Sequence, residues 1–194
     1  TRFLWAETPS NPTLFVMDIA GLAEIAHAHN IPLVVDNTLA TPCLQQPLAL
    51  GADIVVHSLT KFMGGQGAIV GGSIVAKQEL IRNMVSTIAQ VGSIMSPMDA
   101  WLVLMGLETL PLRIARHSTN AERLAEYLSQ HPKVKGVNYP SLQQYPQREL
   151  AKRQMPNGFG GLLSFEVEGG REGAVQVINS FRLKDKFDIV LAST

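Results

Sequence analysis

The chain has 194 residues, of which 46% are hydrophobic and 16% are charged, and its formal net charge is zero. This composition is typical of a globular protein of one to two domains with a sizeable core, and the balanced charge argues against a basic surface for nucleic acid or membranes. The single cysteine, Cys43, excludes an internal disulfide and a cysteine-built metal cluster, and no apolar run reaches the roughly 18 residues that a membrane span needs.

Apolar, β-branched runs alternate with helical patterns in the first half of the chain. Four strands are predicted, at residues 2–7, 32–36, 53–57 and 68–76. Helices are predicted at MDIAGLAEIAHAHN, where Asp18 is the expected N-cap, and at KQELIRNMVSTIAQ after the fourth strand. This alternation predicts an α/β fold with a mostly parallel sheet that helices cover on both faces.

A long helix and a smaller region follow. The helical pattern over residues 97–131 is almost continuous, and the patterns after it are shorter. There we expect strands near KVKGVNY, GLLSFEV and FDIVLA and helices near QREL and REGAVQVINSF, which suits a small α+β domain. The predicted division is part of a large domain at residues 1–115, a bridging helix at 116–131 and part of a C-terminal α+β domain at 132–194.

Asn11 and Asp36 follow the first two predicted strands. Asp36 ends the run IPLVVD, and in parallel α/β sheets ligands gather beyond such strand ends. A carboxylate there can pair with a pyridinium nitrogen, or it can close a turn or cap the next helix. Asn11, in the stiff turn ETPSNPT, can donate to a cofactor oxygen or a substrate carboxylate, or it can form an Asx turn.

Lys61 lies in the run ADIVVHSLTKFMGGQG, after an apolar strand and before a glycine-rich bend, and Ser58 and Thr60 directly precede it. An amine beside small hydroxyls suits an aldehyde cofactor that carries a phosphate, and pyridoxal 5'-phosphate is the candidate. The alternative is a solvated surface lysine. Asn11, Asp36 and Lys61 are evenly spaced, each by one strand–helix–strand step, so strand ends can bring them to one rim.

Other chemistries have weaker support. Ser58 and Lys61 match the S-x-x-K motif of serine acyl-transfer enzymes, but the match follows a strand and no K-T-G motif accompanies it. His27 and His29 are two residues apart on a predicted helix and cannot share a face, so we expect no metal site. A non-enzymatic module with a degenerate cofactor pocket would not need both Lys61 and Asp36. An enzyme is therefore favoured.

The chain closely resembles the cysteine/methionine-metabolism (trans-sulfuration) family of pyridoxal-phosphate enzymes in three runs: ETPSNPT, VVDNTLATPCLQQPLALGADIVVHSLTKFMGGQGAIVGG and SPMDAWLVLMGLETLPLRIARHS. The resemblance implies the aminotransferase-like (type I) fold for the large domain. It also implies that Lys61 is the Schiff-base lysine and that Asp36 is the partner of the pyridinium nitrogen. Ser58 and Thr60 match the family's phosphate-binding hydroxyls, and Asn11 matches its cofactor or substrate contact.

The runs GGQG and SPMDAWLVLMGLETL most resemble the O-succinylhomoserine sulfhydrylase branch of this family. That branch carries out γ-replacement on O-succinyl- or O-acetylhomoserine, and with sulfide it makes homocysteine for methionine biosynthesis. Cystathionine gamma-synthase and a cystathionine or methionine gamma-lyase are the alternatives, because family members differ in whether replacement or elimination follows the shared first steps.

The resemblance also implies a longer protein that forms a homo-oligomer. Family members extend beyond both ends, so we expect this chain to be the middle and part of the C-terminal portion of a larger enzyme. A dimer or tetramer with sites shared between subunits is implied, acting on a small amino-acid substrate. Residues 1–17 contain Arg2, Glu7 and prolines and do not read as a signal peptide, so a cytoplasmic location is expected.

Overall fold

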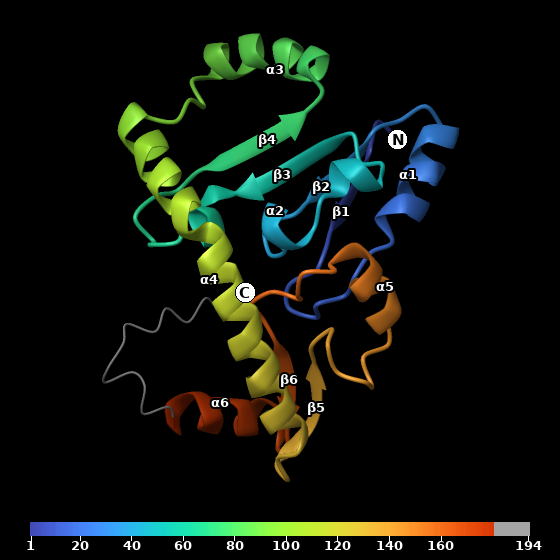
Figure 1. Cartoon of the computed structure of the whole chain (residues 1–194), viewed down its shortest axis with the longest axis vertical. Helices are drawn as coiled ribbons and strands as arrows, with labels where there is room; N and C mark the ends of the chain where they lie inside the picture. Colours follow the sequence, from blue (N-terminus) through green and yellow to red (C-terminus); the bar gives the residue numbers. More distant parts are fainter. Residues whose placement is uncertain (181–194) are drawn as a thin grey trace.

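The computed structural model describes residues 1–180, and its larger sheet has four strands (Figure 1). These are β1 (Leu4–Glu7), β2 (Leu33–Asp36), β3 (Ile54–Ser58) and β4 (Gly72–Ala76), and they lie side by side in that order. The first three strands are parallel, and β4 is antiparallel to β3. The predicted α/β fold with a mostly parallel sheet is confirmed.

The fourth strand begins later than the sequence pattern predicts. The Leu59 N–H donates to the Gly71 carbonyl at 2.9 Å, and the Thr60 hydroxyl accepts from the Gly71 N–H at 3.1 Å. These bonds hold Gly71 against the turn that follows β3. Pairing with β3 therefore starts only at Gly72, opposite Ser58, and the predicted strand residues before it are irregular.

One face of the sheet packs against helix α1 (Ile19–Ala28). Side chains alternate along a strand, so paired residues share a face, and the buried cluster here comprises Ala6, Leu33, Val35 and Val55 from the sheet and Ile19, Ala23 and Ala26 from α1. Asp18 caps α1 as predicted. On the opposite face Trp5 is 55% exposed and Ile74 is 44% exposed. On the same face Val34, which pairs with Trp5, is buried, and the prediction that helices cover both faces stays a prediction.

The long helix α4 (Pro97–Ser129) connects the two parts of the structure (Figure 1). Its buried residues are spaced as one helical face requires: Val103, Gly106, Leu110, Ile114, Ala121 and Ala125. Besides α1, four shorter helical segments precede it: α2 (Thr41–Leu44), the 3-10 turn η1 (Pro47–Leu50), the π-helical turn η2 (Leu59–Met63) and α3 (Gln78–Val91). The predicted helix at residues 97–131 is confirmed, and it ends at Ser129.

A second, two-stranded sheet lies beside the C-terminal half of α4. Its antiparallel strands are β5 (Val134–Asn138) and β6 (Ser164–Val167), with α5 (Arg148–Gln154) between them and α6 (Gly170–Ser180) after them. The predicted strand FDIVLA lies outside the described residues. Tyr139 and Met155 share a buried core with α4 and with Val16 and Leu44, so the two parts are packed together, and the three-part division of the chain stays a prediction.

Within residues 1–180, no helix combines the length and the apolar character that crossing a membrane requires.

Candidate active site

The carboxyl ends of the parallel strands lie along one edge of the larger sheet. In the register of the sheet, Glu7 pairs with Asp36, and Asp36 pairs with Val56. Strand β3 continues to Ser58, and the chain then turns through η2, which carries Lys61. The last residues of β2 and β3, Asp36 and Ser58, therefore lie at the same rim, and Lys61 follows in the turn after β3. The prediction that Asn11, Asp36 and Lys61 form one site stays a prediction.

Lys61 is exposed and interrupts its own helical turn, with φ of −90° and ψ of −126°. Its carbonyl accepts a hydrogen bond from the Gly65 N–H at 2.9 Å, which closes the turn behind it. Its side-chain amine makes no hydrogen bond and no ion pair within the described residues. The backbone of Lys61 is therefore held while its amine is available to a ligand.

Asp36 uses one carboxylate oxygen in a turn and keeps the other free. Its Oδ1 accepts from the Thr38 N–H at 2.9 Å, which is the turn-closing role given above as an alternative. No hydrogen bond within residues 1–180 involves Oδ2, and the side chain is half-buried. The turn and a cofactor contact are therefore compatible, because the turn orients the carboxylate and leaves one oxygen to bind.

Thr38 is a site residue that sequence reasoning missed. Its N–H contacts Asp36, and its hydroxyl accepts from the Ser58 N–H at 2.8 Å, so it joins the ends of β2 and β3. The signal was a threonine two residues after a strand-end acid, a common turn pattern. The pattern predicts the contact with Asp36, but only the pairing of β2 with β3 places Ser58 within reach.

The two hydroxyl groups near Lys61 differ in their availability. The Ser58 hydroxyl makes no hydrogen bond in the described part of the chain. The Thr60 hydroxyl accepts from the Gly71 N–H at 3.1 Å. It also donates to the Gly71 carbonyl at 3.4 Å, which is a long and therefore weak hydrogen bond. The Ser58 hydroxyl is therefore free of hydrogen bonds within the described residues, whereas the Thr60 hydroxyl has a structural role in shaping the turn.

Asn11 lies in an exposed turn beyond β1. Its backbone N–H donates to Glu7 Oε1 at 3.2 Å, and the turn is held by the Ser10 hydroxyl, which lies 2.8 Å from the Thr13 hydroxyl. The amide side chain of Asn11 makes no hydrogen bond within residues 1–180, so the Asx-turn alternative is not seen. No hydrogen bond joins Asn11 to the other candidates in this part of the chain.

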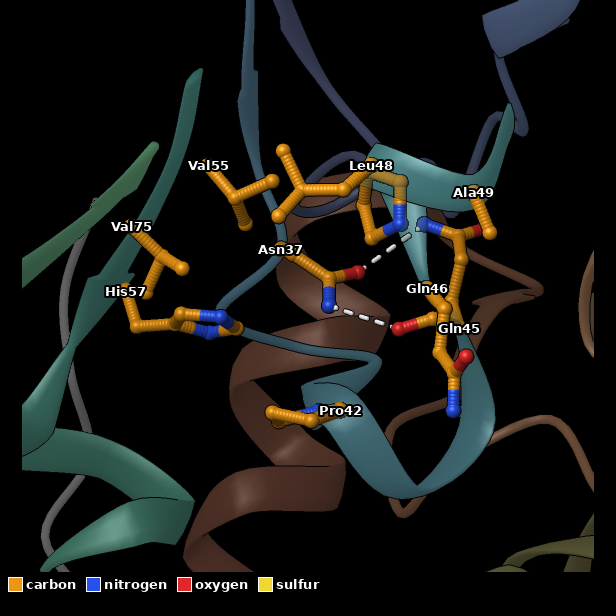
Figure 2. Close-up of a pocket in the computed structure, with 10 residues that line it drawn as sticks. Asn37, Pro42, Gln45, Gln46, Leu48, Ala49, Val55, His57 and Val75 are labelled. Carbon is orange, nitrogen blue, oxygen red and sulfur yellow. Dashed lines mark hydrogen bonds between the residues drawn. The ribbon is translucent and has the colours of Figure 1, made fainter. Parts of the chain in front are cut away.

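A pocket of about 330 Å³ lies near the ends of β2 and β3, on the face of the sheet opposite to Asp36 and Ser58 (Figure 2). Its lining includes Asn37, Gln45, Val55 and His57, and none of the candidate residues lines it. Strand geometry explains the separation, because successive side chains point to opposite faces. Burial lowers the pKa of His57 more than the nearby Asp36 carboxylate raises it, so its imidazole is neutral at pH 7. This pocket is not the candidate active site.

The free groups at the rim fit pyridoxal phosphate. An amine can bond to its aldehyde carbon, a carboxylate oxygen can accept from its ring nitrogen and a hydroxyl can donate to its phosphate. Lys61, Asp36 and Ser58 offer these three groups without breaking a hydrogen bond that the structure contains.

The family of Cys/Met metabolism PLP-dependent enzymes matches residues 1–187 of the chain. The chain belongs to this family. Among its relatives, an O-succinylhomoserine sulfhydrylase from Pseudomonas aeruginosa is 47% identical over 94% of the chain and 45% of its own length. An L-methionine gamma-lyase from Fusobacterium nucleatum is 40% identical over 94% of the chain and 47% of its own length.

Solved structures of the Cys/Met metabolism family have the same fold. The structure of a cystathionine gamma synthase from Xanthomonas oryzae, in complex with aminoacrylate and cysteine, is similar with a TM-score of 0.92 and 40% identity, and the match covers 49% of its own length. The chain spans about half the length of the relatives it matches. The family depends on pyridoxal phosphate, as the residues at the rim predict.

Proposed function

We propose that the intact protein carries out γ-replacement on O-succinylhomoserine or O-acetylhomoserine, with sulfide as the nucleophile and homocysteine as the product. The observation that carries this proposal is the 47% identity to an O-succinylhomoserine sulfhydrylase. Three groups without hydrogen-bond partners in the described residues support the use of the cofactor: the Lys61 amine, one carboxylate oxygen of Asp36 and the Ser58 hydroxyl.

Each rim residue has a proposed role toward the cofactor. Lys61 would hold its aldehyde carbon covalently, and Asp36 Oδ2 would accept from its ring nitrogen. The hydroxyls of Ser58 and Thr60 would donate to its phosphate, and the amide of Asn11 would contact a cofactor oxygen or the substrate carboxylate. When bound, the cofactor supplies an electron sink for the negative charge that develops at the substrate α-carbon.

Lys61 has a second proposed role in moving protons. The Lys61 amine would also take the substrate α-proton when it is not bound to the cofactor, because it makes no competing contact within residues 1–180. The positive charge held at the ring nitrogen by Asp36 makes that proton easier to remove. The neutral His57 is buried and lines the pocket on the other face of the sheet, so we assign it no role in this step.

Two other reactions of the family are the alternatives. The structural similarity to a cystathionine gamma synthase favours cysteine as the nucleophile, and the similarity to a methionine gamma-lyase favours elimination. The test supplies the full-length enzyme with an O-acylhomoserine and with sulfide or cysteine at equal concentration. Faster formation of homocysteine than of cystathionine supports our proposal. A preference for cysteine indicates the synthase, and rapid 2-oxobutanoate release without a nucleophile indicates a lyase.

We also infer a cytoplasmic homo-oligomer, a dimer or a tetramer, with small amino acids as substrates. The location rests on the role of the family in amino-acid metabolism. The oligomer is supported by large apolar side chains that stay exposed on β1, on α4 and before β4: Trp5 at 55%, Trp101 at 53% and Val70 at 88%. Light scattering of the full-length protein measures its mass, and a monomer at micromolar concentration contradicts the inference.

A further inference from the structure

Arg113 of helix α4 binds the turn that carries Lys61. Its Nη1 donates to the carbonyl of Phe62, the residue next to Lys61, at 2.8 Å. Its Nη2 donates to the Gly106 carbonyl at 2.7 Å, and its Nε donates to the Thr109 hydroxyl at 3.1 Å. Two of these three hydrogen bonds hold the planar guanidinium against its own helix, and the third, to Phe62, joins α4 to the turn. A flexible ammonium could not make all three.

Two glycines provide the space for this contact. A Cβ on Gly65 would lie 2.5 Å from the Arg113 Cζ atom, in the position that the guanidinium occupies. A Cβ on Gly106 would lie 2.5 Å from the carbonyl oxygens of Met63 and Gly64, so α4 and the turn are in backbone contact. Backbone cannot move aside as a flexible side chain can, and any larger residue at 106 would push the turn away from the helix.

The turn is also held by the bonds to Gly71 and by the packing of Leu59 and Met63 against core residues. Its internal bonds run from the Gly64 N–H to the Leu59 carbonyl and from the Gly65 N–H to the Lys61 carbonyl, both at 2.9 Å. The residues from Gly65 to Ala68 are exposed, so packing does not hold them. Charged donors make stronger hydrogen bonds than neutral ones, and Arg113 supplies such a bond to the turn at Phe62, directly after Lys61.

We propose that Arg113 is a positioning residue that fixes the backbone of the Lys61 turn, and that Gly65 is small to admit the guanidinium. The effect of Arg113 on catalysis rests on the role proposed for Lys61. A side chain that must reach a cofactor carbon and then a substrate proton needs a fixed backbone, since small displacements of a reacting group reduce the rate strongly. Arg113 itself touches neither reactant in this proposal.

The first test measures hydrogen–deuterium exchange in the cofactor-free, full-length protein. Arg113→Met keeps the length of the side chain and removes its donors, and Arg123→Met is the control at an exposed position of the same helix. We expect exchange in residues 59–67 to rise roughly tenfold or more in Arg113→Met and to be unchanged in the control. Unchanged exchange in that segment would overturn the proposal.

A second pair of variants tests the contact from the other side. Gly65→Ala and Gly67→Ala place a methyl group at similar positive φ, 74° and 65°, but only the first meets Arg113, because nothing lies within 4 Å of a Cβ on Gly67. The backbone penalty is therefore matched. Exchange in residues 59–67 should rise more in Gly65→Ala, and equal effects of the two variants would contradict the steric argument. This pair also decides the matter if Arg113→Met does not fold.

Kinetics then connect the turn to the reaction. Arg113→Met should lower kcat with little change in KM. Arg113→Lys should recover only part of the lost kcat, because lysine keeps the positive charge but lacks the planar set of N–H donors of the guanidinium. The exchange result does not depend on the cofactor. Failure of the proposed role of Lys61 would appear as covalent cofactor in a Lys61→Ala variant, whereas failure of this proposal would appear as normal exchange and normal kcat in Arg113→Met.

Discussion

Lys61, Asp36 and Ser58 each keep one side-chain group that forms no hydrogen bond within residues 1–180. An amine, a carboxylate oxygen and a hydroxyl at one sheet edge can together bind a polar ligand that carries the complementary groups. The backbone around them is held by Thr38 and by the turn that follows β3. Firm backbone with free side chains is the arrangement that a bound cofactor needs.

Lys61→Ala in the intact enzyme should remove the covalent cofactor and the turnover together. The variant loses both the anchoring amine and the proton carrier, and we expect activity to fall by several orders of magnitude, roughly 10³-fold or more. Borohydride reduction followed by mass measurement detects cofactor on the protein. Lys77→Ala, at an exposed position, is the control. Covalently retained cofactor in Lys61→Ala would refute the assignment.

Asp36→Asn should keep the covalent cofactor but slow exchange of the substrate α-proton with solvent. An amide accepts a hydrogen bond but carries no charge, so the ring nitrogen is no longer held protonated, and the rate should fall by about two orders of magnitude. The amide still accepts from the Thr38 N–H, so the turn is preserved. Proton exchange followed by NMR measures the effect, and a near-normal rate would remove Asp36 from this role.

His57 should make the stability of the protein depend on pH. Burial lowers its pKa below the value of about 6.5 of the unfolded chain, so the unfolded state binds a proton that the folded state does not. Its contribution to stability is complete above pH 6.5 and falls as the pH drops below that value. His57→Phe should flatten this dependence in urea unfolding between pH 5 and 7.5. His29→Gln, at an exposed position, is the control, and equal slopes for wild type and His57→Phe would contradict the prediction.

At the scale of elements, two glutamine side chains fasten the segment before α1 to the C-terminal part. Gln147 accepts from the Val16 N–H at 2.8 Å and donates to the Val16 carbonyl at 2.6 Å. Gln154, at the end of α5, accepts from the Ile19 N–H and donates to the Met17 carbonyl, both at 2.9 Å. Each side-chain amide accepts from one backbone N–H and donates to one backbone carbonyl, as a neighbouring strand would. These backbone groups are thus hydrogen-bonded although water does not reach them.

Gln154→Ala should therefore destabilise the protein by about 1–3 kcal/mol, because the buried Ile19 N–H loses its partner. Gln143→Ala removes an amide from an exposed position and should change stability by less than about 0.5 kcal/mol. Urea unfolding midpoints compare the two variants with the wild type. Equal midpoints for Gln154→Ala and Gln143→Ala would show that the paired amide contributes nothing.

At the scale of the whole molecule, the described residues leave the sheet with two unpaired edges, at β1 and β4. Exposed strand edges and apolar side chains such as Trp5 favour association. The rim also offers the cofactor phosphate neutral hydroxyls only, while a phosphate carries close to two negative charges. We therefore expect a cation from another segment or another subunit to complete the phosphate site.

We accordingly expect a polypeptide of residues 1–194 alone to be inactive and to bind pyridoxal phosphate weakly. The measurement compares this polypeptide with the full-length protein for mass, cofactor affinity and turnover. Full activity from a 194-residue monomer would show that the rim binds the phosphate without outside charge, and it would also refute a site shared between subunits.

Sequence alone determined the order of elements, the mostly parallel sheet and the identity of the candidate residues, because periodicity and turn chemistry are local properties. It placed Asp18 at the start of α1 and Lys61 after β3, and both positions depend on neighbours in the chain. Only the tertiary structure decided that Thr60 is bound to Gly71 and that Arg113 reaches the Phe62 carbonyl, 51 residues away. Such contacts depend on how distant elements pack, and no local pattern records that packing.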